Sequence, residues 1–396
     1  MNARATATGL TLAGARPCDH RDMMTRLAAA TVLLTATVGL APTGARSVPR
    51  GTGGAPRSLH LQAPPPQVPS PQAVVDRLSF DRYRNNVAQL AGFGTRYWRS
   101  AGNRQARDWI EAELASFGYA VQRHPIRVAA PLDQLLDTGA DSVYVTKVGT
   151  LHPDRMYIVS AHMDSINTES PDHGFAPGAD DDGSGTSLVL ELARVFAAAD
   201  IETEVSVRFI LWNAEEIGLV GSRTYVRDRQ PLQGIEDPPG SGRFPEPHWL
   251  GIIQHDMLLF DHGLPDPATG MVADRQIADA DVDIEYDAAN TAGGGAMVLA
   301  SMLLAANARY GTLYPAEVGQ FMCCTDSVPF APFVPAVSVR ENERRAEIGR
   351  GANPHWHKSS DVFATYREED FRLGFTALRM TGGALAELAG ARITGR

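Results

Sequence analysis

Apolar residues form runs of strand length that alternate with amphipathic stretches of helical length in the central part of the chain. Residues 156–161 and 205–212 are almost entirely apolar, as is typical of strands buried on both faces of a sheet. Between them, residues 187–199 carry leucine, valine and phenylalanine around most of a helical circumference. This order of strand, turn, helix and strand predicts a βαβ unit with two parallel strands.

The same reasoning extends the prediction along the chain. Helical periodicity covers residues 103–117, and Gly118 ends that helix. Together these elements predict an α/β fold, a mostly parallel mixed central sheet flanked by helices in one domain. The further elements are strands at 250–254 and 333–339, a helix at 292–310 and a surface-packed helix at 368–388.

The N-terminal part of the chain has a different composition. Within residues 1–46, a basic flank precedes an apolar run, Leu27–Leu40, and small residues follow, which predicts a leader and a signal peptide. Residues 47–73 are rich in proline and glycine, which cannot build a core, and are expected to form a linker or pro-segment. We therefore expect a secreted or periplasmic protein whose folded domain covers residues 74–396. An uncleaved single-helix anchor is the alternative, although the run is short for a membrane span.

Composition and charge narrow the classes of function. The 396 residues carry a formal net charge of −10, so the chain lacks the basic face that nucleic-acid binding needs. No apolar run of about 20 residues follows the leader, so no stable membrane insertion of the domain is expected. The three cysteines are Cys18, Cys323 and Cys324, which exclude a long-range disulfide framework in the domain. The adjacent pair either forms a strained vicinal bridge or remains as two thiols. We expect a monomer.

Histidine and carboxylate residues follow the predicted strands, at the sheet edge where parallel strands open onto a ligand-binding crevice. Each motif alone is more often a structural or surface feature, so the signal lies in their combination and order. Two histidines and three carboxylates, without thiolates, suit a pair of borderline divalent ions. The candidate metal ligands are His162, Asp181, Glu216, Asp256 and His357.

Three acidic residues have more specific expected roles. Asp181 lies in the turn between two strands, so it can bridge two ions that would sit roughly 3.5–4 Å apart. Asp164 follows His162 by two residues on the same side of an extended chain, which lets it orient that imidazole. Glu215 neighbours Glu216 but points elsewhere, which leaves it available as a catalytic base.

These motifs resemble those of the co-catalytic two-zinc exopeptidases of the aminopeptidase S and aminopeptidase Y type, peptidase family 28 of the metallo class. The likeness spans roughly residues 80–390. The matching segments are S-A-H-M-D-S at 160–165, G-A-D-D-D-G-S-G at 178–185, N-A-E-E-I-G-L-V-G-S at 213–222, Q-H-D-M at 254–257, D-S-V-P-F at 326–330 and W-H-K-S-S-D at 356–361.

The resemblance implies a zinc exopeptidase-like (phosphorylase/hydrolase-like) fold with one catalytic domain. It also implies a metalloaminopeptidase that removes N-terminal residues from peptides with a free N-terminus. Two Zn²⁺ per chain are implied: one bound by His162, Asp181 and Asp256, the other by Asp181, Glu216 and His357. Glu215 would take a proton from the water that the two metals activate and return it to the leaving amine.

Other features either extend the resemblance or depart from it. Relatives have a cis peptide after the bridging aspartate, which predicts a cis bond between Asp181 and Asp182. Relatives often carry a carbonyl-polarising tyrosine where this chain has Trp356 or Met322, so the oxyanion-stabilising group is not identified. The Pro- and Gly-rich residues 227–248 are expected to form an insertion-like loop on the strand-end side that shapes substrate access.

Three alternatives stay open at this point. A carboxypeptidase or a single-zinc glutaminyl cyclase would use a related site, and a peptidase-like binding module would keep the fold without catalysis. Metal stoichiometry separates the cyclase from the two-zinc enzymes. His124 fits none of the motifs and is expected to be structural or exposed.

Overall fold

The computed structural model describes residues 71–394 except 130–134, 261–281, 321 and 342–352. The leader and signal peptide predicted at 1–46, and the linker as far as residue 70, lie outside the described residues. The last linker residues belong instead to a short helix, α1 (Pro71–Val75), which begins the described chain. No helix in this described part is both long and apolar enough to span a membrane.

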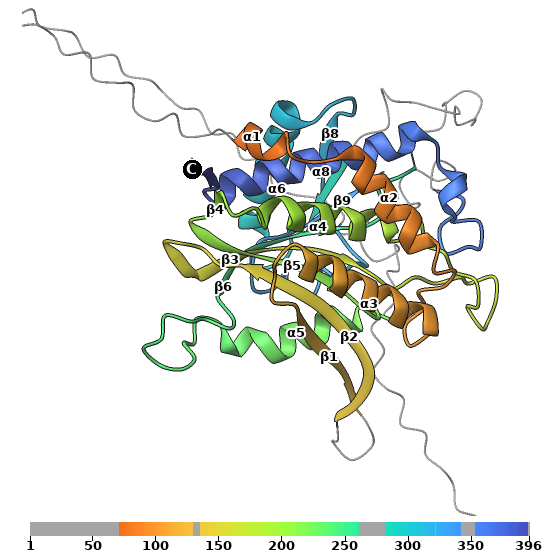
Figure 1. Cartoon of the computed structure of the whole chain (residues 1–396), viewed down its shortest axis with the longest axis horizontal. Coiled ribbons are helices and arrows are strands. Elements are labelled where there is room, and N and C mark those ends of the chain that lie inside the picture. Colours follow the sequence, from red (N-terminus) through yellow and green to blue (C-terminus); the bar gives the residue numbers. More distant parts are fainter. Residues whose placement is uncertain (1–70, 130–134, 261–281, 321, 342–352, 395–396) are drawn as a thin grey trace, which may run out of the picture. The chain divides into compact units, whose positions relative to one another are not determined.

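One mixed sheet lies at the centre of the described chain (Figure 1). Its strands are β1 (Gln122–Ala129), β2 (Leu135–Lys147), β3 (His152–His162), β5 (Val205–Trp212), β6 (His248–His255), β7 (Val282–Tyr286), β8 (Ala316–Gly319) and β9 (Ala336–Arg340). They lie in the order β1-β2-β5-β3-β6-β9-β7-β8. The inner strands β5, β3, β6 and β9 are parallel, whereas β2 and β7 run antiparallel to β5 and β9. The predicted mostly parallel mixed sheet is confirmed.

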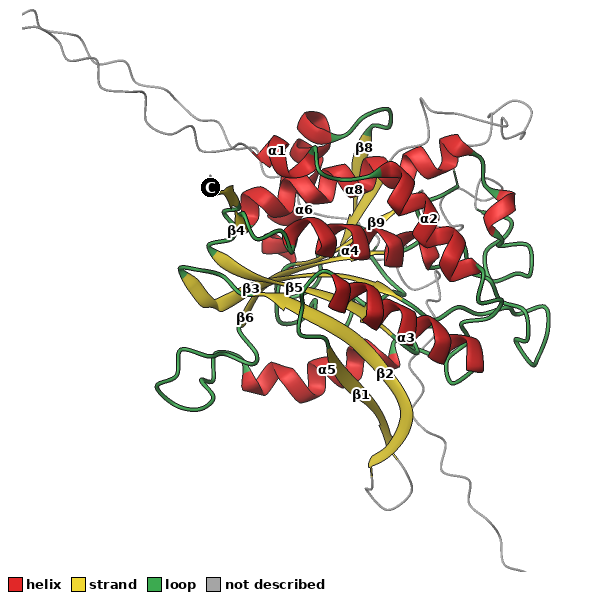
Figure 2. Cartoon of the chain, viewed as in Figure 1, coloured by secondary structure: helices red, strands yellow, loops and turns green. Residues whose placement is uncertain are grey.

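Helices flank the sheet (Figure 2). They are α2 (Phe80–Ala91), α3 (Ala101–Ser116), α4 (Gly183–Phe196), α5 (Val220–Arg229), α6 (Gly293–Tyr310) and α8 (Glu368–Leu388). Short elements complete the described chain: the 3-10 turns Gln230–Leu232 and Phe363–Thr365, and the strand pair β4 (Ile201–Glu202) and β10 (Arg392–Ile393).

Alternating side chains of the inner strands supply two cores. Along β5, Phe209 and Leu211 belong to the larger core, which includes residues of α1, α2, α3, α4, α6 and α8. Ile210 and Trp212 point to the other face and pack with Tyr225 of α5. Because successive strand residues face opposite sides, an all-apolar strand requires cover on both faces. The near-continuous apolar pattern of β3 and β5 thus accounts for their central position.

The boundaries of some helices and strands, and the burial of α8, differ from the expectations. Helix α4 begins at Gly183 because the Asp182 carboxylate accepts the backbone N–H of Gly185 at 2.8 Å and caps the helix. Strand β7 is not among the strands that the apolar pattern predicts. The prediction that α8 is surface-packed was wrong: α1, α2, α4 and α6 enclose it and bury most of its residues.

The predicted position of the 227–248 loop was also wrong. Its first residues complete α5 and a 3-10 turn, and the rest leads directly into the amino end of β6. Because β6 runs parallel to β3, the chain must return to the amino edge of the sheet before β6 begins. This loop therefore lies at the edge opposite the strand ends that carry His162 and Glu216.

Candidate metal centre

The carboxyl ends of three parallel strands meet at one edge of the sheet and carry most of the predicted ligands. His162 is the last residue of β3, Glu216 lies just beyond β5, and Asp256 follows β6 directly. Asp181 stands in the turn before α4, and His357 comes from the loop before the 3-10 turn at 363–365. The fold thus brings together all five residues from segments far apart in sequence.

Asp181 lies between the two histidines. Its Oδ1 atom is 3.2 Å from Nε2 of His162, and its Oδ2 atom is 3.1 Å from Nε2 of His357. The two oxygens of one carboxylate therefore face two different imidazoles. This is the arrangement expected of a carboxylate that bridges two cations.

Glu216 and Asp256 each lie beside one of the two histidines that face Asp181. Glu216 Oε2 lies 3.1 Å from Nε2 of His357, and Asp256 Oδ1 lies 3.8 Å from Nε2 of His162. Candidate ligand atoms of His162, Asp181 and Glu216 all lie within 4.8 Å of one another. The Oε1 atom of Glu216 is buried and has no hydrogen-bond donor among the described residues. An orphaned carboxylate oxygen in such a cluster has room for a cation as its partner.

The Asp164 carboxylate lies closer to the backbone N–H groups of the glutamate pair than to the imidazole of His162. It accepts the backbone N–H groups of Glu215 and Glu216 at 3.1 and 3.4 Å. Its Oδ1 atom lies 3.6 Å from Nδ1 of His162, and that nitrogen lies 3.2 Å from the Asp164 backbone carbonyl. Asp164 therefore holds the end of β3 and the segment after β5 in one geometry.

Burial and like charges raise the pKa of the glutamate pair. For Glu215, burial is the largest effect; Glu216, Asp326 and Asp256 raise its pKa further, while His162 opposes them, and the net pKa lies well above the ordinary value. Burial and then Asp181 raise the pKa of Glu216 to about 7. A carboxylate with a raised pKa is suited to accept and return a proton near neutral pH.

Two acidic residues that had no predicted role hold the turn that carries Asp181. Asp361 accepts the backbone N–H groups of Asp180 and Asp181 at 2.9 and 3.1 Å. Asp182 accepts the backbone N–H of His162 at 3.0 Å in addition to capping α4. Both residues fall within quoted motifs, so their positions were available in the sequence although their hydrogen-bond partners were not.

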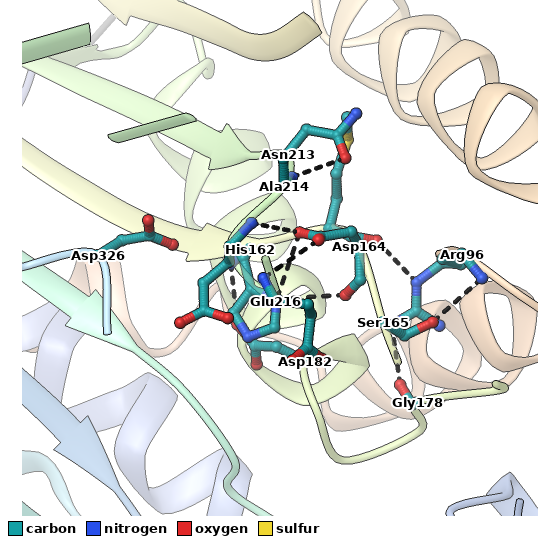
Figure 3. Close-up of polar contacts among 12 residues, drawn as sticks. Arg96, His162, Asp164, Ser165, Gly178, Asp182, Asn213, Ala214, Glu216 and Asp326 are labelled. Atoms are coloured by element: carbon teal, nitrogen blue, oxygen red, sulfur yellow. Dashed lines mark hydrogen bonds and ion pairs between the residues drawn. The ribbon is translucent and has the colours of Figure 1, made fainter. Parts of the chain in front are cut away.

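Two arginines near the site had no signal in the sequence that could have identified them. Arg96, in the loop before α3, donates from Nε to the carbonyl of Met163 at 2.9 Å and from a terminal nitrogen to that of Gly178 at 2.8 Å (Figure 3). It joins the end of β3 to the acidic turn. On β9, a terminal nitrogen of Arg340 lies 3.9 Å from Oδ2 of Asp256.

The backbone has unusual conformations next to the predicted ligands. The peptide bond between Asp181 and Asp182 is cis, which confirms that prediction. Ala214, Met257 and His357 are non-glycine residues with φ of 61°, 58° and 55°. Such residues cost of order 1–3 kcal/mol each and tend to cluster at functional sites.

Comparison with known proteins identifies the family. The family model described as "Peptidase family M28" matches residues 142–374, which is more than half of the chain. The chain belongs to peptidase family M28. A probable aminopeptidase of Saccharomyces cerevisiae is 29% identical over 209 residues, which are 48% of this chain and 54% of that protein. The chain thus spans about half the length of this curated relative.

Solved structures of other proteins share the fold. The LapA aminopeptidase of Legionella pneumophila matches with a TM-score of 0.58 and 18% identity, over 84% of this chain and 79% of that chain. The glutaminyl cyclase of Porphyromonas gingivalis matches with a TM-score of 0.55 and 20% identity, over 79% and 99%. At these identities, the likeness supports the zinc exopeptidase-like fold and does not distinguish between the two activities.

The residues at the M28 site fit divalent cations. Its donors are imidazole nitrogens and carboxylate oxygens, as zinc prefers. Near this cluster the described residues place one fully buried arginine, Arg96, and the partly buried Arg340, so carboxylates greatly outnumber permanent positive charges. The buried carboxylates are Asp164, Asp180, Asp181, Asp182, Glu215, Glu216, Asp256, Asp326 and Asp361. Burying so many carboxylates beside so few permanent positive charges is costly, and bound cations would remove that cost.

Proposed function

We propose that this M28 protein is a zinc-dependent aminopeptidase with two Zn²⁺ per chain. The observation that carries the proposal is the position of Asp181, whose two oxygens face His162 on one side and His357 on the other. His162, Asp181 and Asp256 would hold one ion. Asp181, Glu216 and His357 would hold the other. When bound, zinc supplies Lewis-acid activation of a water and of the scissile carbonyl.

Glu215 is the proposed general base. It is buried, it lies directly before a ligand, and it has a raised pKa. In this role it accepts a proton from the attacking water and returns it to the leaving amine. Asp164 fixes Glu215 through the backbone N–H at 3.1 Å, so the base has a defined position before substrate binds.

Peptides with a free N-terminus are the proposed substrates. A protonated amine is a cation, and the excess of buried carboxylates would favour it at this site. The apolar N-terminal segment at Leu27–Leu40 supports a secreted or periplasmic location. In that location, the enzyme would shorten extracellular peptides from their amino ends.

Hydrolysis of leucyl p-nitroanilide by the purified protein tests the proposal. The protein should release nitroaniline, lose that activity with a zinc chelator, and regain it when zinc is added back. A matched N-acetyl-leucyl anilide should not be cleaved, because it lacks the free amine. Cleavage of both substrates, or activity that survives complete removal of metal, would contradict the proposal.

A glutaminyl cyclase is the second candidate, because a cyclase shares the fold. It predicts one zinc ion per chain and conversion of an N-terminal glutamine to pyroglutamate. The presence of two histidine–carboxylate clusters that share Asp181 favours the two-zinc enzyme, since a single ion would leave one of them without a cation. Mass spectrometry of a glutaminyl peptide after incubation separates the two: hydrolysis removes the residue, whereas cyclisation releases ammonia.

A further inference from the structure

Two adjacent cysteines form a vicinal thiol pair beside the metal centre. The Sγ atoms of Cys323 and Cys324 lie 2.6 Å apart, and the structure has both residues as thiols. This separation is close to the 2.03–2.05 Å length of a disulfide bond, so little movement is needed to join the two sulfurs. The proposed peptidase reaction uses neither side chain.

The pair is accessible to small molecules. Cys324 is exposed and Cys323 is partly buried. Cys324 has a φ of 62°, in the left-handed region that non-glycine residues rarely adopt. Cys324 is therefore the more accessible of the two thiols, and Cys323 is the residue directly before it in the sequence.

The pair also lies next to a positive charge that contacts the metal centre. The Arg340 guanidinium interacts electrostatically with Cys323 and with Asp256. The same guanidinium is 3.9 Å from Asp256. Since the thiolate is the form that attacks a disulfide, a guanidinium beside Cys323 suits thiol–disulfide exchange.

We propose that Cys323 and Cys324 form a reversible modification site that exchanges with small-molecule disulfides such as oxidised glutathione. The Cys324 thiolate attacks one sulfur of the disulfide, forms a mixed disulfide and releases one glutathione thiolate. The Cys323 thiolate then attacks Sγ of Cys324, breaks the mixed bond and releases the second glutathione. Two protein thiols are oxidised, one glutathione disulfide is reduced, and the two thiol protons end on the glutathione molecules.

The adjacency of the two residues makes the bridge easy to reverse. Consecutive Cα atoms are about 3.8 Å apart across a trans peptide, which is shorter than the roughly 4.4–6.8 Å of ordinary disulfides. Bridges outside the ordinary geometry are strained, more readily reduced and therefore labile. The site would thus open and close with the supply of small-molecule disulfides and thiols around it, unlike a permanent structural crosslink.

Mass spectrometry of the full-length protein tests this proposal without measuring peptidase activity. A Cys18→Ser background removes the third thiol, so only the pair can react. After incubation with excess oxidised glutathione, acid quenching and alkylation, the peptide containing the pair should lack two hydrogens and carry no alkyl group. Excess reduced glutathione should then restore two alkylatable thiols.

The control is Cys323→Ser, in which Cys324 should stop at a stable glutathione adduct. Full alkylation of both wild-type thiols after the oxidising step would overturn the proposal, as would a persistent wild-type adduct or a disulfide between two chains. Because the readout is the state of the sulfurs, these results are independent of whether the protein hydrolyses peptides.

Discussion

Two clusters of buried charge touch the same strand, β5, and differ in how that charge is balanced. In the middle of β5, the Arg208 guanidinium donates to Glu246 Oε2 at 2.5 Å, to the hydroxyl of Tyr225 and to the carbonyl of Pro245 at 3.0 Å. The other Glu246 oxygen accepts from Trp249 Nε1 at 2.6 Å. One positive charge meets one negative charge, and both are fully hydrogen-bonded.

The metal centre beyond the end of β5 has no such balance. Its carboxylates outnumber the buried arginines of the described residues, and one Glu216 oxygen lacks a donor there. A buried ion pair is tolerated when its charges and hydrogen bonds are satisfied within the protein. A carboxylate-rich cluster is satisfied only by protons or bound cations. The comparison therefore separates a structural cluster from a functional one.

The largest expected difference between the clusters is in catalysis. Glu215→Gln should lower kcat by about 10²–10⁴-fold, because the variant cannot accept the proton of the attacking water. Its zinc content should not change. The matched variant Glu246→Gln removes a buried glutamate from the other cluster and should retain kcat. Steady-state hydrolysis of leucyl p-nitroanilide measures both, and near-normal turnover of Glu215→Gln would exclude Glu215 as the base.

The same two variants should have opposite effects on stability. Glu246→Gln leaves Arg208 buried without its counter-charge and should lower the free energy of unfolding by about 3–5 kcal/mol. Glu215→Gln removes a carboxyl whose folded-state pKa is raised, so the metal-stripped variant should be as stable as the parent or more stable at pH 8. Urea denaturation of metal-stripped proteins gives both values. Equal losses of unfolding free energy in the two variants would contradict the proposed difference between the two charge clusters.

Metal removal should destabilise the protein through the metal centre alone. Ions that bind only the folded state add about 2.7 kcal/mol per site at a free concentration 100-fold above Kd. Chelation should therefore lower the Tm of the parent protein and of Glu246→Gln by similar amounts. The decrease should be much smaller in Asp181→Asn, because this variant has lost the bridging charge. A uniform decrease in all three proteins would indicate an effect of the chelator unrelated to the metal centre.

The smallest expected effect concerns a neutral histidine near the Arg208 cluster. Burial, followed by Arg229, lowers the pKa of His124 to about 4, and its ring lies 5.1 Å from that of Tyr225. Between about pH 6.5 and 4 the unfolded chain binds this proton and the folded protein does not, so stability falls as the pH falls. The contribution is about 1 kcal/mol for each pH unit. His124→Gln should show a shallower decline in unfolding free energy between pH 6 and 5, and an unchanged slope would contradict the assignment.

Apolar patterning was sufficient to predict the centre of the fold. The runs that became β3 and β5 are almost wholly apolar, so they could only be inner strands with cover on both faces. Their order with α4 then determined which polar residues lie at the carboxyl edge, including His162 and Glu216. The short strand β7, which lies second from one edge of the sheet, was missed, because Asp283 and Glu285 interrupt the apolar pattern of a five-residue element.

Partners that depend on tertiary structure could not be predicted. Arg96 lies in a loop with no motif, and its role depends on the carbonyls of Met163 and Gly178 coming together. The carboxylate of Asp164 was expected to orient an imidazole, but the fold also directs it to two backbone N–H groups. Residue spacing shows which side chains share an edge of the sheet, whereas the hydrogen-bond partner of each depends on loops whose path the pattern does not determine.

Counting zinc in the purified protein tests the central claim most directly. Elemental analysis of the intact chain should find two zinc ions per polypeptide, and an Asp181→Asn variant prepared in the same way should have lost at least one of them. Glu246→Gln, with the same chemical change at the balanced cluster, should retain both. One ion or none in the parent protein, or two in Asp181→Asn, would contradict a carboxylate-bridged pair of ions at this site.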